Sequence, residues 1–190
     1  MATVGGIPIL EQDPDVKVEW VSWEGRPPGA PFKSFTPEER QEVYQKVHKP
    51  LADKYGVDIN VVSKNSYRTT NAHMATFYAR DMGKFAGFRD RVYQALWVDN
   101  LDLESPDVLA RLGEDVGLDG DEIRKVIEEK RYFGALQSQR AQGKSLGIFG
   151  IPCFVVEGKI FWGKDVIGDL KEGVARLKKE KLAEQEKEES

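Results

Sequence analysis

The chain has 190 residues, of which 40% are hydrophobic and 32% are charged, and its formal net charge is -4 at pH 7. A chain of this length forms one domain, or one domain with an insertion, and can bury a core of its own. The nearly balanced charge argues against nucleic acid and acidic membranes as partners, because no excess of basic side chains is available to meet phosphates.

The sequence shows no sign of a membrane span or of an export signal. Mean hydropathy is -0.51, and no window approaches the roughly 18 apolar residues that a spanning helix needs. Met1–Leu10 has neither a basic start nor a long apolar run, so we expect a soluble, cytoplasmic protein. The single cysteine, Cys153, excludes an internal disulfide, a C-x-x-C redox pair and a cysteine-based zinc site within these residues.

A β-strand is expected near the start of the chain. In Val16–Trp23 (VKVEWVSW), positions on one face are apolar and those on the other are mostly polar, which is typical of a strand with one buried face. The next segment, Gly25–Pro31, has three prolines and two glycines and is predicted to be a loop.

Helical periodicity dominates the middle of the chain. Thr36, followed by Pro37 and two glutamates, is a helix start, and Pro50 is expected to kink or break the helix that follows. Apolar spacing and capping residues predict four more helices. They span Thr70–Met82, Phe85–Leu96, Ser105–Gly117 and Asp119–Leu136.

The pattern changes period near the C-terminus. Two short β-branched and aromatic runs, Cys153–Val156 and Lys159–Trp162, flank Glu157-Gly158, and this arrangement predicts an antiparallel hairpin with a two-residue turn. A last helix follows. From Arg176 onward most residues are charged, so we expect this helix to fray into a solvated tail.

The segment Gly147–Asp165 (GIFGIPCFVVEGKIFWGKD) closely resembles the second half of the thioredoxin-like domain in the DsbA superfamily. It is similar to the 2-hydroxychromene-2-carboxylate isomerases and class kappa glutathione transferases, whose pattern is G-V-F-G-x-P-x-F-x-V-x-G-x-x-F-W-G-x-D. Glu19–Pro31 and the pair Ala72-His73 look more like the FrnE-type DsbA oxidoreductases. The similarity covers residues 14–178, most of the chain.

This resemblance implies an α/β protein with a thioredoxin-like fold, in which an all-helical insertion separates the first retained strand from the C-terminal β-hairpin. The predicted order of strand, helices, hairpin and helix agrees with such a division. The thioredoxin-like domain would comprise residues 14–36 and 147–178, the helical insertion residues 37–146, and the charged tail residues 179–190.

The resemblance also implies a binding site at Gly150, Ile151 and Pro152. A proline at the start of a strand cannot donate to the ladder, so it belongs at an edge or a bend. The resemblance favours a cis bond between Ile151 and Pro152, and the alternative is an ordinary trans proline that ends a loop. In the family this dipeptide pairs, strand-like, with the backbone of a peptide or of glutathione. Asp165 matches the acid that binds the γ-glutamyl amine in kappa-type enzymes, and it would also serve as an ordinary helix cap.

Other residues that invite a chemical role are predicted to be structural. Cys153 follows the proline in an apolar strand, where burial raises a thiol pKa and makes it inert; contact with a substrate thiol is the alternative. His48 and His73 are too few for a set of metal ligands. All four tryptophans are predicted to belong to the core: Trp20, Trp23, Trp97 and Trp162.

The family's catalytic group has no evident counterpart in this sequence. It lies at the start of the first helix, just after a first strand, and is C-x-x-C in the oxidoreductases or a serine in the glutathione-dependent enzymes. The helix dipole lowers a thiol pKa at that point. Fifteen residues precede Val16, too few for a strand, a turn and a helix, although Ile7–Gln12 fits the end of such a helix.

The absent strand would lie between Val16–Trp23 and Cys153–Val156, so both would keep an unpaired edge. Four explanations stay open. The protein starts upstream of Met1, the segment Thr3–Leu10 fills the gap, the two flanking strands pair directly, or another chain supplies the strand.

Three functions follow from the resemblance. The first is a DsbA-type thiol–disulfide oxidoreductase whose catalytic C-x-x-C segment is absent from this chain, because a dithiol cycle needs two cysteines. The second is a glutathione-dependent isomerase or transferase, with glutathione as a co-substrate and no tightly bound cofactor. The third is a non-catalytic module that binds a thiol-bearing peptide or glutathione. A homodimer is compatible with each.

Overall fold

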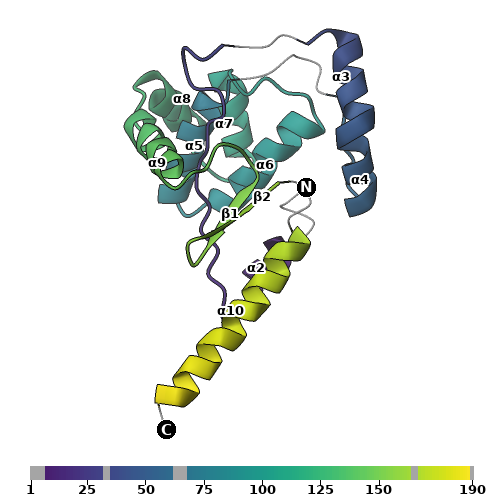
Figure 1. Cartoon of the computed structure of the whole chain (residues 1–190). Helices are drawn as coiled ribbons and strands as arrows, with labels where there is room; N and C mark the ends of the chain where they lie inside the picture. Colours follow the sequence, from purple (N-terminus) through teal and green to yellow (C-terminus); the bar gives the residue numbers. More distant parts are fainter. Residues whose placement is uncertain (1–6, 32–34, 62–67, 164–166, 189–190) are drawn as a thin grey trace. The chain divides into compact units, whose positions relative to one another are not determined.

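The computed structural model describes residues 7–31, 35–61, 68–163 and 167–188 (Figure 1). The chain divides into two compact units: residues 1–20 with 148–190 form the first, and residues 21–147 form the second. Among the described helices, none is both long and apolar enough to cross a membrane.

The second unit is built from helices around one core. Ala75, Phe88, Leu109 and Ile123, which come from four successive helices, are completely buried in it. The elements of this unit are α3 (Pro37–Val43), η1 (Tyr44–His48), α4 (Lys49–Tyr55), α5 (Thr70–Asp81), α6 (Phe85–Trp97), α7 (Pro106–Glu114), α8 (Gly120–Glu128) and α9 (Phe133–Ser145).

Three predicted helix starts are confirmed by their hydrogen bonds. Thr36 and Glu39 form a capping box at α3, in which each backbone N–H donates to the other residue's side chain, at 2.9 and 3.2 Å. Ser105 accepts from the Val108 N–H at the start of α7. Asp119 accepts from two amides of α8. These side chains satisfy N–H groups that have no partner within the helix.

Pro50 does not end its helix, because a π-helical turn precedes it. The turn η1 joins α3 to α4, and Pro50 stands in the first turn of α4. A proline ring clashes with the carbonyl four residues earlier in a regular α-helix, and the irregularity here takes the form of a single π-helical turn before it. Gly56, at φ 62°, ends α4.

The single helix predicted over Asp119–Leu136 is wrong, because the structure divides it into α8 and α9. Lys130, between them, has a φ of 52°, and a helix cannot continue through this left-handed conformation. Apolar residues keep helical spacing across the break, and neither glycine nor proline marks it. The sequence pattern therefore concealed this boundary.

Where the chain enters the second unit, it is held by α9 and α5. The Ser22 N–H donates to Gln139 Oε1 (2.9 Å), and Arg140 Nε donates to the Glu24 carbonyl (3.2 Å). The Glu24 carboxylate is fully buried and accepts from the Thr70 hydroxyl, while its Oε2 has no hydrogen-bond partner among the residues that the structure describes. These bonds fix the segment that precedes the proline-rich loop.

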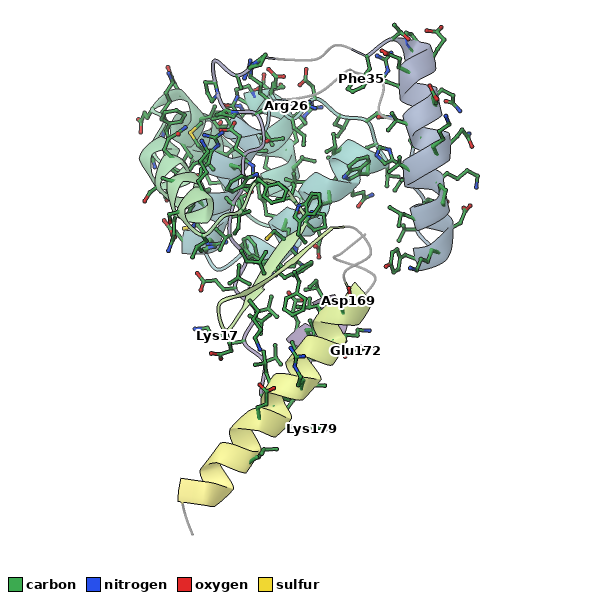
Figure 2. The ribbon with its side chains drawn as sticks, in the orientation of Figure 1. Lys17, Arg26, Phe35, Asp169, Glu172 and Lys179 are labelled. Carbon is green, nitrogen blue, oxygen red and sulfur yellow. The ribbon has the colours of Figure 1, made fainter. Side chains whose placement is uncertain are left out.

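The strand predicted at Val16–Trp23 is not formed. Val16, Val18 and Trp20 pack against the core of the first unit, while the residues between them, including Lys17 (Figure 2), are exposed. The predicted alternation of buried and exposed residues is therefore correct. No ladder accompanies it, because within the described residues the sheet consists of the two hairpin strands alone, and a strand needs a hydrogen-bonded neighbour.

The hairpin forms with the predicted bounds: β1 is Cys153–Val156 and β2 is Lys159–Trp162, paired antiparallel. Glu157 and Gly158 have φ values of 46° and 74°. A type I′ turn requires positive φ at both central residues, and its twist matches that of the strands. The turn chemistry thus fixes the register of the hairpin.

One face of the hairpin covers the core of the first unit. Phe154, Val156 and Phe161 pack there against buried side chains from α2 (Ile7–Glu11) and α10 (Ile167–Glu188) (Figure 1). The buried residues of this core are Ile7, Leu10, Leu170 and Val174.

The last helix, α10, extends further than predicted. It continues to Glu188, whereas fraying was expected from Arg176. Most residues in this stretch are Lys, Glu, Ala and Leu, which are strong helix formers. Lys178 joins the helix to the N-terminal segment, because its Nζ lies 2.5 Å from Asp13 Oδ1 and 3.0 Å from Asp15 Oδ2.

Gly173 of α10 should not tolerate a side chain. A Cβ at this position would lie 2.6 Å from Cζ of Phe161, so Gly173→Ala would push the hairpin away from the helix. We expect this substitution to lower the free energy of unfolding by about 1–3 kcal/mol, the usual cost of overpacking, as measured by urea denaturation.

Gly168→Ala is the matched control on the same helix, since no atom of the described residues lies within 4 Å of a Cβ built there. It should leave stability unchanged or raise it by up to about 1 kcal/mol, because alanine favours helices over glycine. Equal effects of the two substitutions would contradict the close contact between α10 and the hairpin.

Candidate binding site at the hairpin edge

The first strand of the hairpin has an unpaired edge. The two-residue turn determines which opposite residues exchange backbone hydrogen bonds. Along the hairpin, pairs that exchange these bonds alternate with pairs that do not. The Gly163 N–H donates to the Pro152 carbonyl (3.1 Å), in keeping with this alternation. The N–H and C=O groups of Cys153 and Val155 therefore point away from β2. Within the described residues, no third strand pairs with them.

The loop Gly150-Ile151-Pro152 lies at the end of this edge. The Ile151–Pro152 peptide bond is cis. Ile151 is 64% exposed, and no described residue forms a backbone hydrogen bond with its N–H or its C=O. A Cβ on Gly150 would lie 3.1 Å from Nε1 of Trp162, so the loop backbone runs close to the indole ring.

Cys153, the predicted low-reactivity thiol, is the first residue of β1 and is partly buried. Burial raises the pKa of its thiol, because a less polar environment disfavours the thiolate. The thiolate is the nucleophilic form. At neutral pH this cysteine is therefore a poor nucleophile, which favours its structural interpretation.

Asp165, predicted to bind an amine or to cap the last helix, lies outside the described residues. The structure accordingly brings three of the predicted binding residues, Gly150, Ile151 and Pro152, to the hairpin edge and leaves the role of the fourth as a prediction.

Two aromatic side chains border the loop, and sequence reasoning missed the exposure of both. Phe149 is 77% exposed and Trp162 is 53% exposed, and their ring centroids lie 5.0 Å apart with the planes tilted by 45°. The assignment of Trp162 to the core is therefore wrong. The hairpin pattern contained the signal, since Phe161 faces the core and the next residue in a strand must face the other way.

The two histidines lie in the helical unit. Burial lowers the pKa of His73 to about 4, so its imidazole is neutral at pH 7. His48 contacts Trp97 edge-on, with ring centroids 5.1 Å apart. Among the described residues, no three His, Cys, Asp or Glu side chains form a group that could hold a metal ion.

One of the four explanations for the absent strand is wrong, and a second is narrowed. Within the segment Thr3–Leu10, the residues from Ile7 onward belong to the helix α2 (Ile7–Glu11) and do not fill the gap as a strand, while residues 3–6 lie outside the described residues. Val16–Trp23 does not pair with β1, which excludes direct pairing of the two flanking segments. A start upstream of Met1 and a strand from another chain stay predictions.

Comparison with known proteins identifies the family. A family model described as the DSBA-like thioredoxin domain matches residues 7–175. The match spans most of the chain, and the chain therefore belongs to the DSBA-like thioredoxin family. The resemblance to the DsbA superfamily and the thioredoxin-like fold are both confirmed.

Individual relatives come from more than one branch. The chain is 28% identical over 158 residues to the uncharacterized protein YwbO of Bacillus subtilis (strain 168), a match covering 80% of this chain and 79% of that protein. It is 29% identical over 131 residues to a 2-hydroxychromene-2-carboxylate isomerase of Sphingobium xenophagum, covering 66% of each. The crystal structure of a probable DsbA oxidoreductase, SCO1869 of Streptomyces coelicolor, superposes with a TM-score of 0.67 at 20% identity, over 78% of this chain and 70% of that one.

The raised pKa of Cys153 predicts slow alkylation. The rate of reaction with iodoacetamide follows the thiolate fraction. The pH at which Cys153 reacts at half its maximal rate should therefore lie above the corresponding pH of a short unstructured cysteine peptide in the same buffer. In urea the difference should vanish, because unfolding removes the burial. A midpoint below that of the peptide would show an activated thiol and would refute the structural interpretation.

Proposed function

We propose that this chain is a DsbA-type thiol–disulfide oxidoreductase protein whose Gly150–Pro152 loop holds a thiol-bearing peptide. Membership of the family supports thiol chemistry as the class of function. The observation that carries the proposal is the exposed Ile151, whose N–H and C=O have no backbone partner within the described residues.

The loop leaves one residue with two backbone groups to offer. Pro152 has no N–H, and its carbonyl already accepts from Gly163. Ile151, one residue earlier, keeps both its donor and its acceptor. Unpaired groups at a strand edge are a template for another extended chain. A peptide that pairs with Ile151 would have its main chain fixed at two points, which would define where its cysteine side chain lies.

The redox-active dithiol is not among these 190 residues, which contain one cysteine. A dithiol cycle needs two thiols, and the pKa of Cys153 is raised. In this proposal the catalytic C-x-x-C segment is absent from the chain, and the hairpin edge supplies the binding platform for the substrate.

A glutathione-dependent isomerase or transferase is the second candidate. It is favoured by the 29% identity to a protein named 2-hydroxychromene-2-carboxylate isomerase and by the sequence Phe161-Trp162-Gly163, which fits the F-W-G element of that group. Glutathione would then be the co-substrate, and its main chain would pair with Ile151 in place of a peptide.

Titration calorimetry with the 190-residue chain distinguishes the two candidates. The probes are a cysteine-containing hexapeptide and reduced glutathione. Binding of the peptide alone supports the oxidoreductase-type proposal, whereas tighter binding of glutathione supports the isomerase or transferase. If neither probe binds, both candidates fail.

Ile151→Pro should weaken binding of the hexapeptide, because it removes the Ile151 N–H. One net hydrogen bond is worth roughly 0.5–1.5 kcal/mol, so we expect about a two- to tenfold rise in Kd. Ile151→Ala keeps both backbone groups and is the matched control. Urea denaturation verifies that both variants are folded. Equal affinities of two folded variants would contradict pairing at Ile151.

A further inference from the structure

We infer that Phe149 and Trp162 determine specificity at the proposed platform, by selecting an uncharged, apolar side chain next to the thiol of the bound segment. This inference rests on the proposed function and deepens it. It starts from an exposed pair of rings that the fold does not need for its core.

The two rings belong to the face of the hairpin that is turned away from the core of the first unit. Cys153 lies opposite Trp162 and Val155 lies opposite Ile160, and all four are on this face because neighbouring strand residues alternate. Val155 and Ile160 are 44% and 46% exposed. Phe149 extends the face through its contact with Trp162.

The rings stand beside the backbone groups that would hold the guest. A Cβ on Gly150 would lie 3.1 Å from Nε1 of Trp162, and Gly150 is the residue directly before Ile151. Phe149 precedes Gly150 and is the most exposed large apolar residue among those described. The aromatic pair therefore lies within one or two residues of the pairing position.

Pairing at Ile151 would bring guest side chains to these rings. An extended segment directs successive side chains to opposite faces. When the cysteine of the bound segment lies on the face away from Phe149 and Trp162, both of its neighbours therefore lie on the face of these two rings. Contacts of aromatic rings with other rings and with apolar groups are stabilising.

The charge pattern of this face restricts the guest further. None of the five side chains that form it, Phe149, Cys153, Val155, Ile160 and Trp162, is charged. A charged side chain of the bound segment would lose hydration there without meeting an opposite charge among these five side chains. The face therefore favours apolar neighbours of the thiol and disfavours acidic or basic ones.

The test uses the full chain and three cysteine hexapeptides in calorimetry, which differ only in having Phe, Ser or Asp on both sides of the cysteine. We expect the Phe peptide to bind at least fivefold more tightly than the Ser peptide and at least tenfold more tightly than the Asp peptide. The Phe149→Ala variant should bind the Phe peptide and the Ser peptide with affinities that differ by less than twofold. Leu182→Ala removes another exposed apolar side chain, on α10 (60% exposed), and should keep the wild-type ratio.

The outcomes separate this inference from the proposed function. If no peptide binds, the proposed function fails. The selection by the aromatic pair is refuted if all three peptides bind with equal affinity, or if Phe149→Ala keeps the wild-type ratio of the affinities for the Phe and Ser peptides. In both cases the proposed peptide binding at Ile151 is not contradicted. Sedimentation equilibrium completes the test: a wild-type dimer that Phe149→Ala converts to monomer, with the ratio unchanged, would assign this face to a second copy of the chain and overturn the inference.

Discussion

The contact between the hairpin and α10 is the constraint on which the binding edge depends. The ring of Phe161 approaches Gly173 so closely that even a methyl group would collide with it. A two-stranded hairpin is marginally stable in water by itself, so this hairpin needs the core that α2 and α10 supply. The core takes up one face of the hairpin, and the described residues of the first unit leave both the other face and the edge of β1 accessible.

An open strand edge accepts any extended chain unless something limits it. Pro152 adds no group to this edge, because it lacks an N–H and its carbonyl accepts from Gly163. Ile151, the residue before it, continues the edge of Cys153 and Val155 and keeps both backbone groups to offer. Such a site suits a short extended main chain, a description that fits a peptide segment and glutathione equally. In both proposed functions the main chain of the ligand, a peptide or glutathione, pairs with the same backbone groups. The two functions differ in the reaction of the ligand's sulfur.

Local signals in the sequence predicted local structure well. Glu157-Gly158 defined the hairpin, and Thr36, Ser105 and Asp119 marked helix starts. The binding platform at the glycine–proline loop stays a proposal. The strand predicted at Val16–Trp23 did not form. Alternation of apolar and polar residues indicates only that one face is buried, and this segment buries one face by packing. A strand also needs a hydrogen-bonded partner, which the sequence of the segment does not specify. The break at Lys130 was missed because apolar residues keep helical spacing across it. The exposure of Trp162 was missed because its residue type suggested core, although strand alternation places it opposite to the core-facing Phe161.

Amide hydrogen exchange in the hairpin tests the open edge most directly. The amides of Phe154 and Val156 point toward β2 and should be protected, whereas those of Cys153 and Val155 should exchange at least tenfold faster, because no strand pairs with them among the described residues. Such an alternating pattern is what the account predicts. Protection of all four amides to the same degree would mean that the edge is already occupied, and the proposed platform would then have no place to bind a guest.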